Sequence, residues 1–286
     1  RGEMACALCL GGNLYGSNPH AARAHAALRK IDTIVYLSTT LNTGHAWGTG
    51  QETLILPVLP RDEEPQPTTQ ESMFSFLRLS DGGPARHIGP RSEVAVLAQL
   101  GQQLLADDPR LDWRQLTSHA AIRELIAELI PGYEGVQSID HTRQEFHVPG
   151  RAVRDYRFPV PDGKARFHPV TPPARASALN TGLQVNPDAP PISDSAVGPT
   201  LTLTTLRSEG QFNSVVYDTE DLYRGQERRD VILMHPLDLS RLGLSTDQQV
   251  RVRSSVGELR YILARPLDIR PGNAAMYYPE ANVLVP

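Results

Sequence analysis

The first third of the chain alternates apolar runs and a helical stretch in strand–helix–strand order. Residues 5–10 form an apolar run as long as a buried strand, and a glycine-rich turn follows them. Asn18 offers an N-cap, and Pro19 suits the first position of an alanine-rich helix over residues 20–30. Residues 33–39 are rich in β-branched side chains, which favours a strand. The pattern predicts one βαβ unit with parallel strands.

The middle of the chain predicts one more strand, a long loop and two helices. Residues 53–59 are a short apolar run. Residues 61–90 are polar and interrupted by Pro and Gly, which is typical of a long loop. Apolar side chains recur at helical spacing over residues 92–106 and again over residues 113–130. We therefore expect two amphipathic helices after the loop.

A proline-rich stretch separates this region from a different pattern towards the C-terminus. Residues 169–199 have little periodicity, so they mark a domain boundary. Beyond them, several short strands surround one small helix that starts at Pro236, which is typical of a β-barrel. We predict an α/β domain over residues 1–170, a linker over residues 171–199 and a barrel over residues 200–286.

Composition and charge narrow the classes of protein. The chain carries a net charge of −4 and only 6% aromatic residues, which disfavours a basic nucleic-acid face and a base-stacking platform. No apolar run approaches the ~20 residues of a membrane helix, and no signal-peptide pattern is present. We expect a cytoplasmic protein without nucleic-acid or membrane partners. Because the chain begins at Arg1 in a strand-like approach, we expect it to be a piece of a longer polypeptide.

Cysteines and histidines predict no metal or redox site. Cys6 and Cys9 form a single CxxC, which is half of a zinc site. Residues three apart on a strand point to opposite faces, so two buried structural thiols are the favoured interpretation. The nine histidines form no HxxxH or HExxH pattern, and no GxSxG elbow occurs. We therefore predict neither metal ligands nor catalytic residues in this chain.

Two polar turns follow the strands of the predicted βαβ unit. Gly12 and Asn13 lie between a strand and a capped helix, where backbone N–H groups can hold a phosphate. Thr40 and Asn42 follow the second strand, and hydroxyl and amide groups there suit a sugar or a purine edge. Both turns should lie at one edge of the sheet, at the carboxyl ends of parallel strands. The alternative is that both are ordinary chain-reversing turns.

A third polar cluster leaves the first strand after the proline-rich stretch. Arg207 could bind a phosphate through two parallel hydrogen bonds, and Gly210 would allow close backbone approach. Gln211 and Asn213 add amides that donate and accept. The alternative is a solvated loop. Further on, Arg224, Arg228 and Arg229 flank Glu227 and Asp230 and are interpreted as a salt-bridged surface.

Taken together, these stretches resemble molybdopterin-dependent oxidoreductases that carry two molybdopterin guanine dinucleotides, and in particular the formate-dehydrogenase-like branch. The resemblance extends in order over nearly the whole chain. It is carried by residues 9–19, 38–45 with 53–57, 158–167, 206–213, 223–225 and 278–282.

The resemblance implies an α/β fold in which a Rossmann-like parallel-sheet segment is followed by a double-psi β-barrel of the molybdopterin-dinucleotide-binding type. It implies cofactor contacts from the two turns and the loop, and it adds Asn282 near the C-terminus. The residues assigned to cofactor binding are Gly12, Asn13, Thr40, Asn42, Arg207, Gly210, Gln211, Asn213 and Asn282.

The same resemblance implies a molybdenum bis(molybdopterin guanine dinucleotide) cofactor in a parent enzyme that performs two-electron redox chemistry. The metal ligand, and any iron–sulfur cluster, would belong to the N-terminal half of that enzyme, so the chain alone should be inactive. Its expected partners are the remainder of the same polypeptide, a small-molecule substrate and an electron-transfer partner. One alternative is a non-catalytic binding or assembly module. An ordinary nicotinamide dehydrogenase is disfavoured because no GxGxxG motif occurs.

Overall fold

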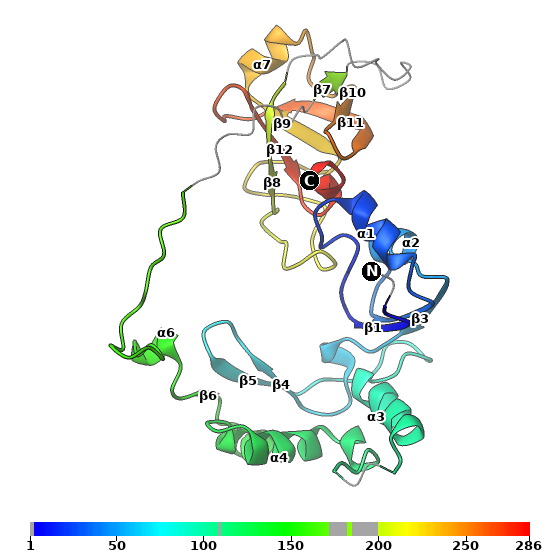
Figure 1. The fold of residues 1–286 in the computed structure, drawn as a ribbon, viewed down its shortest axis with the longest axis vertical. Helices are drawn as coiled ribbons and strands as arrows, with labels where there is room; N and C mark the ends of the chain where they lie inside the picture. The colour runs from blue at the N-terminus through cyan, green and yellow to red at the C-terminus, as the bar shows by residue number, and fades with distance from the viewer. Residues whose placement is uncertain (1–2, 108–109, 172–181, 185–199) are drawn as a thin grey trace. The chain divides into compact units, whose positions relative to one another are not determined.

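A computed structural model describes residues 3–107, 110–171, 182–184 and 200–286 (Figure 1). The chain divides into two compact units, one made of Arg1–Ile55 with Pro173–Pro286 and the other of Leu56–Pro172. The expected α/β domain over residues 1–170 thus divides near residue 55, and its first part clusters with the C-terminal region. The predicted linker over residues 171–199 lies outside the described residues, except for Thr171 and a short strand at Gly182–Gln184.

The N-terminal segment is the predicted βαβ unit. Strand β1 (Cys6–Leu10), helix α1 (Ala21–Leu28) and strand β2 (Thr33–Ser38) follow one another, and the two strands pair in parallel. Helix α2 (Thr43–Trp47) leads to strand β3 (Glu52–Pro57), which completes a sheet of order β1-β2-β3. The predicted parallel unit is confirmed.

The start of α1 differs from the prediction. The helix begins after His20, whose backbone is left-handed with φ of 51° and whose Nδ1 accepts the Arg23 N–H at 3.2 Å. The predicted cap, Asn18, instead donates from Nδ2 to the carbonyl of Leu14. Asn18 is therefore used to close the preceding turn, and a histidine ring nitrogen takes the capping position.

The second unit combines a small antiparallel sheet with helices. Strands β4 (Thr68–Glu71) and β5 (Phe76–Ser80) form a hairpin inside the predicted loop over residues 61–90. The loop prediction was wrong there, because a polar strand such as Thr-Thr-Gln-Glu lacks the apolar alternation that marks strands. The unit also contains η1 (Arg61–Glu63), η2 (Gln115–Thr117), η3 (Glu134–Ser138), α5 (Ile139–Thr142), β6 (Phe146–His147) and α6 (Ala152–Asp155).

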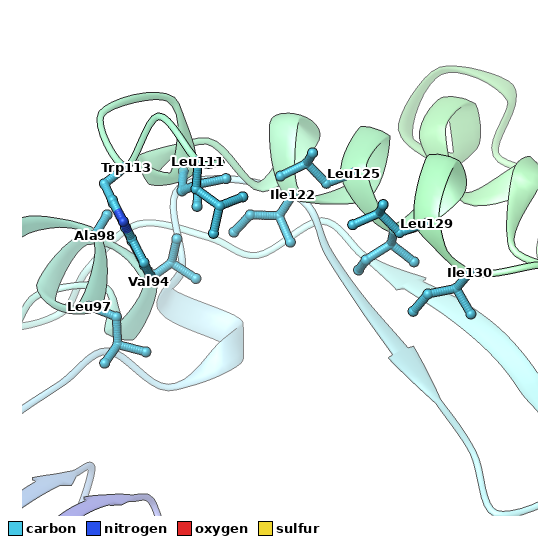
Figure 2. A pocket seen from close by; sticks show the side chains of 11 residues that line it. Val94, Leu97, Ala98, Leu111, Trp113, Ile122, Leu125, Leu129 and Ile130 are labelled. Carbon is cyan, nitrogen blue, oxygen red and sulfur yellow. The ribbon is translucent and has the colours of Figure 1, made fainter. Parts of the chain in front are cut away.

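Two longer helices of this unit were expected, and both are present. Helix α3 is Glu93–Leu104, and helix α4 is His119–Leu129, capped by the hydroxyl of Ser118. Their apolar side chains line a hollow of about 360 Å³ (Figure 2). Trp113, which was expected to open the second helix, packs on Gly101, where an added Cβ would overlap its indole ring. No helix in the described parts of the chain is long and apolar enough to cross a membrane.

The C-terminal region forms a six-stranded mixed sheet of order β7-β10-β11-β9-β12-β8. Strands β8 and β12 pair in parallel, as do β9 and β11, while β10 and β11 form an antiparallel hairpin. Its elements are β7 (Gly182–Gln184), β8 (Thr202–Leu206), β9 (Val231–Met234), α7 (Pro236–Arg241), β10 (Gln248–Arg253), β11 (Glu258–Pro266), β12 (Asn273–Tyr277) and η4 (Glu280–Leu284). Among the described strands, β7 and β8 are the two edge strands and do not pair with each other, so closure into a barrel is not observed there.

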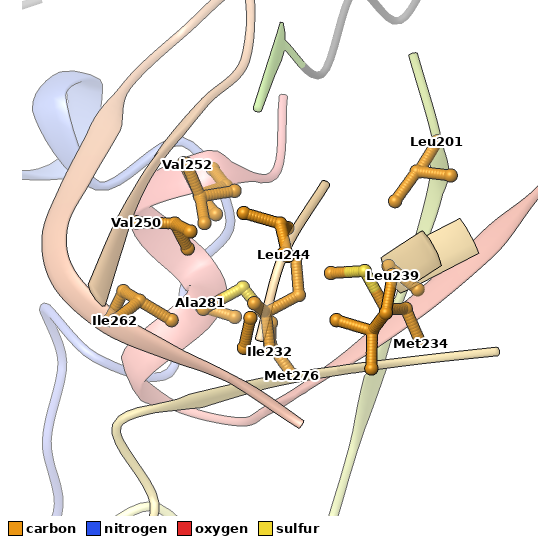
Figure 3. Packing of buried hydrophobic residues seen from close by; sticks show 13 residues of the cluster. Leu201, Ile232, Met234, Leu239, Leu244, Val250, Val252, Ile262, Met276 and Ala281 are labelled. Atoms are coloured by element: carbon orange, nitrogen blue, oxygen red, sulfur yellow. The ribbon is translucent and has the colours of Figure 1, made fainter. Parts of the chain in front are cut away.

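The main hydrophobic core lies within this sheet and beneath α7 (Figure 3). Ile232 and Met234 from β9 pack with Met276 from β12, and all three are at most 2% exposed. Helix α7 begins as expected: Pro236 occupies its first turn, and the His235 ring nitrogen accepts the Leu237 N–H. This packed sheet holds the loop over residues 207–213 and the C-terminal η4.

Candidate cofactor-binding site

The two polar turns of the βαβ unit meet at the same edge of the sheet, as predicted. The Asn13 Nδ2 donates to the Thr43 Oγ1 at 2.7 Å, and the Asn42 Nδ2 donates to the Gly12 carbonyl at 3.4 Å. Parallel strands end at this edge, so the turns that follow β1 and β2 become neighbours.

Within these turns, Asn13 has a structural task. It is only 2% exposed, and its Oδ1 accepts the Gly16 N–H at 2.7 Å while its Nδ2 is bound to Thr43. Both ends of its amide are therefore committed to the turn. By contrast, Gly12 and Thr40 are exposed, and the N–H groups of Gly12 and Leu14 donate to no atom of the described residues. These groups are among those available to a ligand.

His45 organises the second turn and was not assigned to the site from the sequence. Its Nδ1 accepts the Asn42 N–H at 3.1 Å, while the Asn42 side chain accepts the Gly44 N–H, which completes a capping box at the start of α2. Burial lowers the pKa of His45, and its ring packs edge-on against Tyr36. The Asn-x-x-His spacing was the available signal, although Glu or Gln is the usual residue at that position.

The C-terminal η4 reaches the glycine-rich turn through Asn282. This side chain is 6% exposed and donates from Nδ2 to the Gly16 carbonyl at 2.7 Å. The hydroxyls of Ser17 and Ser214 are also 2.7 Å apart, and the His20 N–H donates to the Val285 carbonyl at 2.6 Å. Direct hydrogen bonds thus connect the N-terminal turn with the C-terminal region of this unit.

The loop that carries Arg207 is built by its own amides. The Gln211 Nε2 donates to the carbonyls of Tyr278 and Asn213 at 2.7 and 3.0 Å, so this side chain is not free for a ligand. The Asn213 Oδ1 accepts two backbone N–H groups. An added Cβ at Gly210 would overlap the Asp218 carboxylate, so a larger residue there would require the Asp218 side chain to shift.

Arg229 holds this loop in place, which corrects its interpretation as part of a salt-bridged surface. It is 7% exposed, and its guanidinium donates to Glu280 at 2.7 Å, to Ser208 Oγ at 2.8 Å and to Gln211 Oε1 at 3.1 Å. It also lies 4.2 Å from the ring centroid of Tyr217. The charged residues next to Arg229 in the sequence suggested a surface position. Its acceptors are distant in sequence, so no local pattern indicated them.

The neighbouring arginines differ from Arg229. Arg228 pairs with Asp230 on the surface, as the interpretation expected, whereas Arg224 is partly buried and donates to Asp221. Arg207 is exposed, donates to the Phe212 carbonyl at 3.2 Å and lies over the Tyr278 ring. The other guanidinium N–H groups of Arg207 are available to donate to a ligand, so Arg207 is the exposed cationic donor of the loop.

Among the described residues, no group of three or more His, Cys, Asp or Glu side chains could hold a metal ion. That the chain supplies no metal ligand stays a prediction. Both thiols are free. Cys6 is exposed, which corrects the expectation of two buried thiols, because β1 leaves that face of the strand uncovered. Burial raises the pKa of the Cys9 thiol, which disfavours a thiolate.

Comparison with known proteins assigns the C-terminal region. Residues 201–286 match the molydopterin dinucleotide binding domain family. This stretch is therefore similar in sequence to that domain family. It contains the Arg207 loop, the Arg229 contacts and Asn282, so most of the candidate site outside the βαβ unit lies in this stretch.

Similarity to longer proteins covers the rest of the chain. The whole chain is 31% identical to an uncharacterized oxidoreductase of Mycobacterium tuberculosis, and it spans 36% of that protein's length. It is 29% identical over 82% of its length to protein YdeP of Escherichia coli, where it covers 29% of the relative. The chain spans about a third of the length of the curated relatives that it matches.

A solved structure has a similar fold. Acetylene hydratase from Pelobacter acetylenicus superimposes over 96% of this chain with a TM-score of 0.59, at 16% sequence identity. The chain corresponds to 37% of that structure. The mixed α/β fold with a parallel sheet is thus shared with this enzyme.

Proposed function

We propose that this chain forms part of the binding site for a molybdenum bis(molybdopterin guanine dinucleotide) cofactor in a formate-dehydrogenase-like oxidoreductase. The hydrogen bond from Asn282 to Gly16 is the main support. It joins the region that matches the dinucleotide binding domain family to the glycine-rich turn, so polar groups from both ends of the chain belong to one compact unit.

The residues of the candidate site divide into contacts and supports. Arg207 would bind a phosphate through its free N–H groups, and the N–H groups of Gly12 and Leu14 would bind an anionic oxygen. The Thr40 hydroxyl is exposed and able to donate or accept. The residues Asn13, Asn42, Gln211, Asn213 and Asn282 hold these groups in position, and Gly210 leaves room for Asp218.

When bound, the metal and its pterins would supply the two-electron redox chemistry, and the protein would bind and orient them. The described residues offer no metal ligand set, so the metal ligand and any iron–sulfur cluster would come from elsewhere in a longer polypeptide. The chain alone should therefore be inactive. Its substrate, its electron-transfer partner, its cytoplasmic location and a double-psi arrangement of the C-terminal strands are part of the same proposal.

Nucleotide binding tests this proposal without the metal. We expect calorimetry to detect binding of GDP to the chain, and to detect weaker binding of CDP if the guanine form is preferred. Arg207→Ala should weaken GDP binding about ten- to a hundredfold, because a hydrogen bond to a charged group contributes about 1.5–3 kcal/mol.

Arg253→Ala is the matched control, since Arg253 is an exposed arginine of the same domain on strand β10. It should bind GDP like the unmodified chain. If the Arg207 and Arg253 variants bind GDP with equal affinity, Arg207 does not contact the nucleotide. Absence of any nucleotide binding by the folded chain would contradict the contribution of these turns and this loop.

A further inference from the structure

The second unit contains a polar pocket that the cofactor proposal does not use. It has a volume of about 290 Å³ and is lined from η1, β4 and the N-terminal ends of α3 and α4. One water molecule needs only about 15 Å³ measured in this way, so the pocket can admit a small organic molecule. All of its lining residues belong to the unit formed by Leu56–Pro172.

Four polar atoms of this pocket are buried without a hydrogen-bond partner among the described residues. They are Glu64 Oε1, Thr68 Oγ1, Ser92 Oγ and His119 Nε2. Buried polar atoms are normally hydrogen-bonded, and leaving one unpaired costs about 1–3 kcal/mol. Two of these atoms, Glu64 Oε1 and His119 Nε2, face each other, so the hydroxyls of Thr68 and Ser92 are the ones that lack any facing polar group in the described parts of the chain. The hollow beside them has room for a hydrogen-bonding partner.

The charge of the pocket favours a cation. The Glu64 side chain is 6% exposed. Glu93 also lines the pocket, and its pKa is raised first by its own burial and second by the negative charge of Glu64. His119 Nε2 lies 3.4 Å from Glu64 Oε1, and burial lowers the pKa of His119, which disfavours the charged form of the ring. Arg61 also lines the pocket, and its guanidinium donates to Gln70.

We propose that this pocket binds the guanidinium or ammonium group of a small organic molecule, with the buried Glu64 carboxylate as its main partner. Such a group carries several N–H donors and one positive charge. Glu64 and Glu93 would supply the negative charge, while the hydroxyls of Thr68 and Ser92 would accept further hydrogen bonds. A metal ion is a poorer match, because the described residues contain no group of three or more ligands able to hold one.

The test compares cations with a neutral molecule of the same shape. The ¹⁵N-labelled chain is titrated with ethylguanidinium, ethylammonium and N-ethylurea, and amide shifts are followed by NMR. We expect saturable binding of at least one cation with shifts around residues 64, 68, 92 and 119. The affinity for N-ethylurea should be at least about tenfold lower, because this molecule lacks the positive charge.

Two variants assign the effect to the buried carboxylate. Glu64→Gln should weaken cation binding about tenfold or more, whereas Glu124→Gln, which removes an exposed charge on α4, should leave it unchanged. If the Glu64 variant loses its folded spectrum, Glu93→Gln takes its place.

Three results would overturn the proposal. They are no saturable binding of either cation, equal binding of the cations and N-ethylurea, and retained binding in the folded Glu64 or Glu93 variant. The first of these would mean that only water fills the pocket. GDP binding involves residues of the other unit, so its outcome does not decide this test.

Discussion

Strands β9 and β3 are both apolar runs, yet they have opposite environments. All four residues of β9, Val231–Met234, are at most 1% exposed, because the side chains on each of its faces belong to a buried hydrophobic cluster. In β3, Leu54 is 53% exposed and Leu56 is 41% exposed. An apolar run therefore predicts a strand, but its burial depends on what the rest of the fold places against it.

The polar residues of the site show the same contrast. Arg229 and Arg207 belong to the same C-terminal region and both contact its polar loop. Arg229 is buried and donates to five acceptor groups, whereas Arg207 is exposed and keeps N–H groups free of those acceptors. Buried polar residues hold the loop, and exposed ones are left to bind. Each of the following experiments tests one side of this contrast.

The largest effect is expected for Arg229→Ala. This change removes the buried guanidinium that donates to the Glu280 carboxylate and to the Tyr278 carbonyl, and breaking a buried ion pair costs about 3–5 kcal/mol. Hydrogen exchange of peptides from β9 and β12, followed as a function of urea, would measure the loss. Arg228→Ala removes an exposed pair and should cost less than about 1 kcal/mol. Similar losses in both variants would contradict the distinction between them.

A smaller effect is expected from truncating apolar side chains. Ile232→Ala in β9 removes a fully buried side chain and should lower the free energy of unfolding by about 2–5 kcal/mol. Leu54→Ala in β3 should cost much less, because half of this side chain is already in contact with solvent. The same urea-dependent exchange experiment compares the two, and a larger cost for Leu54 would reverse the comparison.

The smallest effect concerns pH and the turn at His45. Burial lowers the pKa of His45 in the folded state, so the unfolded chain binds more protons than the folded chain as pH falls through about 6.5. The stability associated with this group is therefore present above that pH and is lost on acidification. Urea midpoints at about pH 7.5 and about pH 5.5 would show a larger drop for the unmodified chain than for His45→Gln. Equal drops would contradict a buried, neutral His45.

Sequence reasoning was most successful where the decisive contacts are local. The βαβ unit, helices α3 and α4, and the start of α7 at Pro236 all follow from periodicity and capping residues close in sequence. The meeting of the two turns was also predictable, because parallel strands end at one edge. The hairpin of β4 and β5 was missed because its first strand is polar.

The residue pattern predicted the βαβ unit, helices α3 and α4, the two polar turns and the loop that begins at Arg207. Which of those polar groups are available to a ligand depends on contacts formed in the folded chain. Gln211 is committed because Tyr278 lies beside it, and Asn282 bonds to Gly16 across 266 positions of the chain. Glu64 and His119 likewise meet only after folding. A hydrogen bond depends on where its partner lies in space, and residues far apart in sequence carry no local pattern that records the pairing.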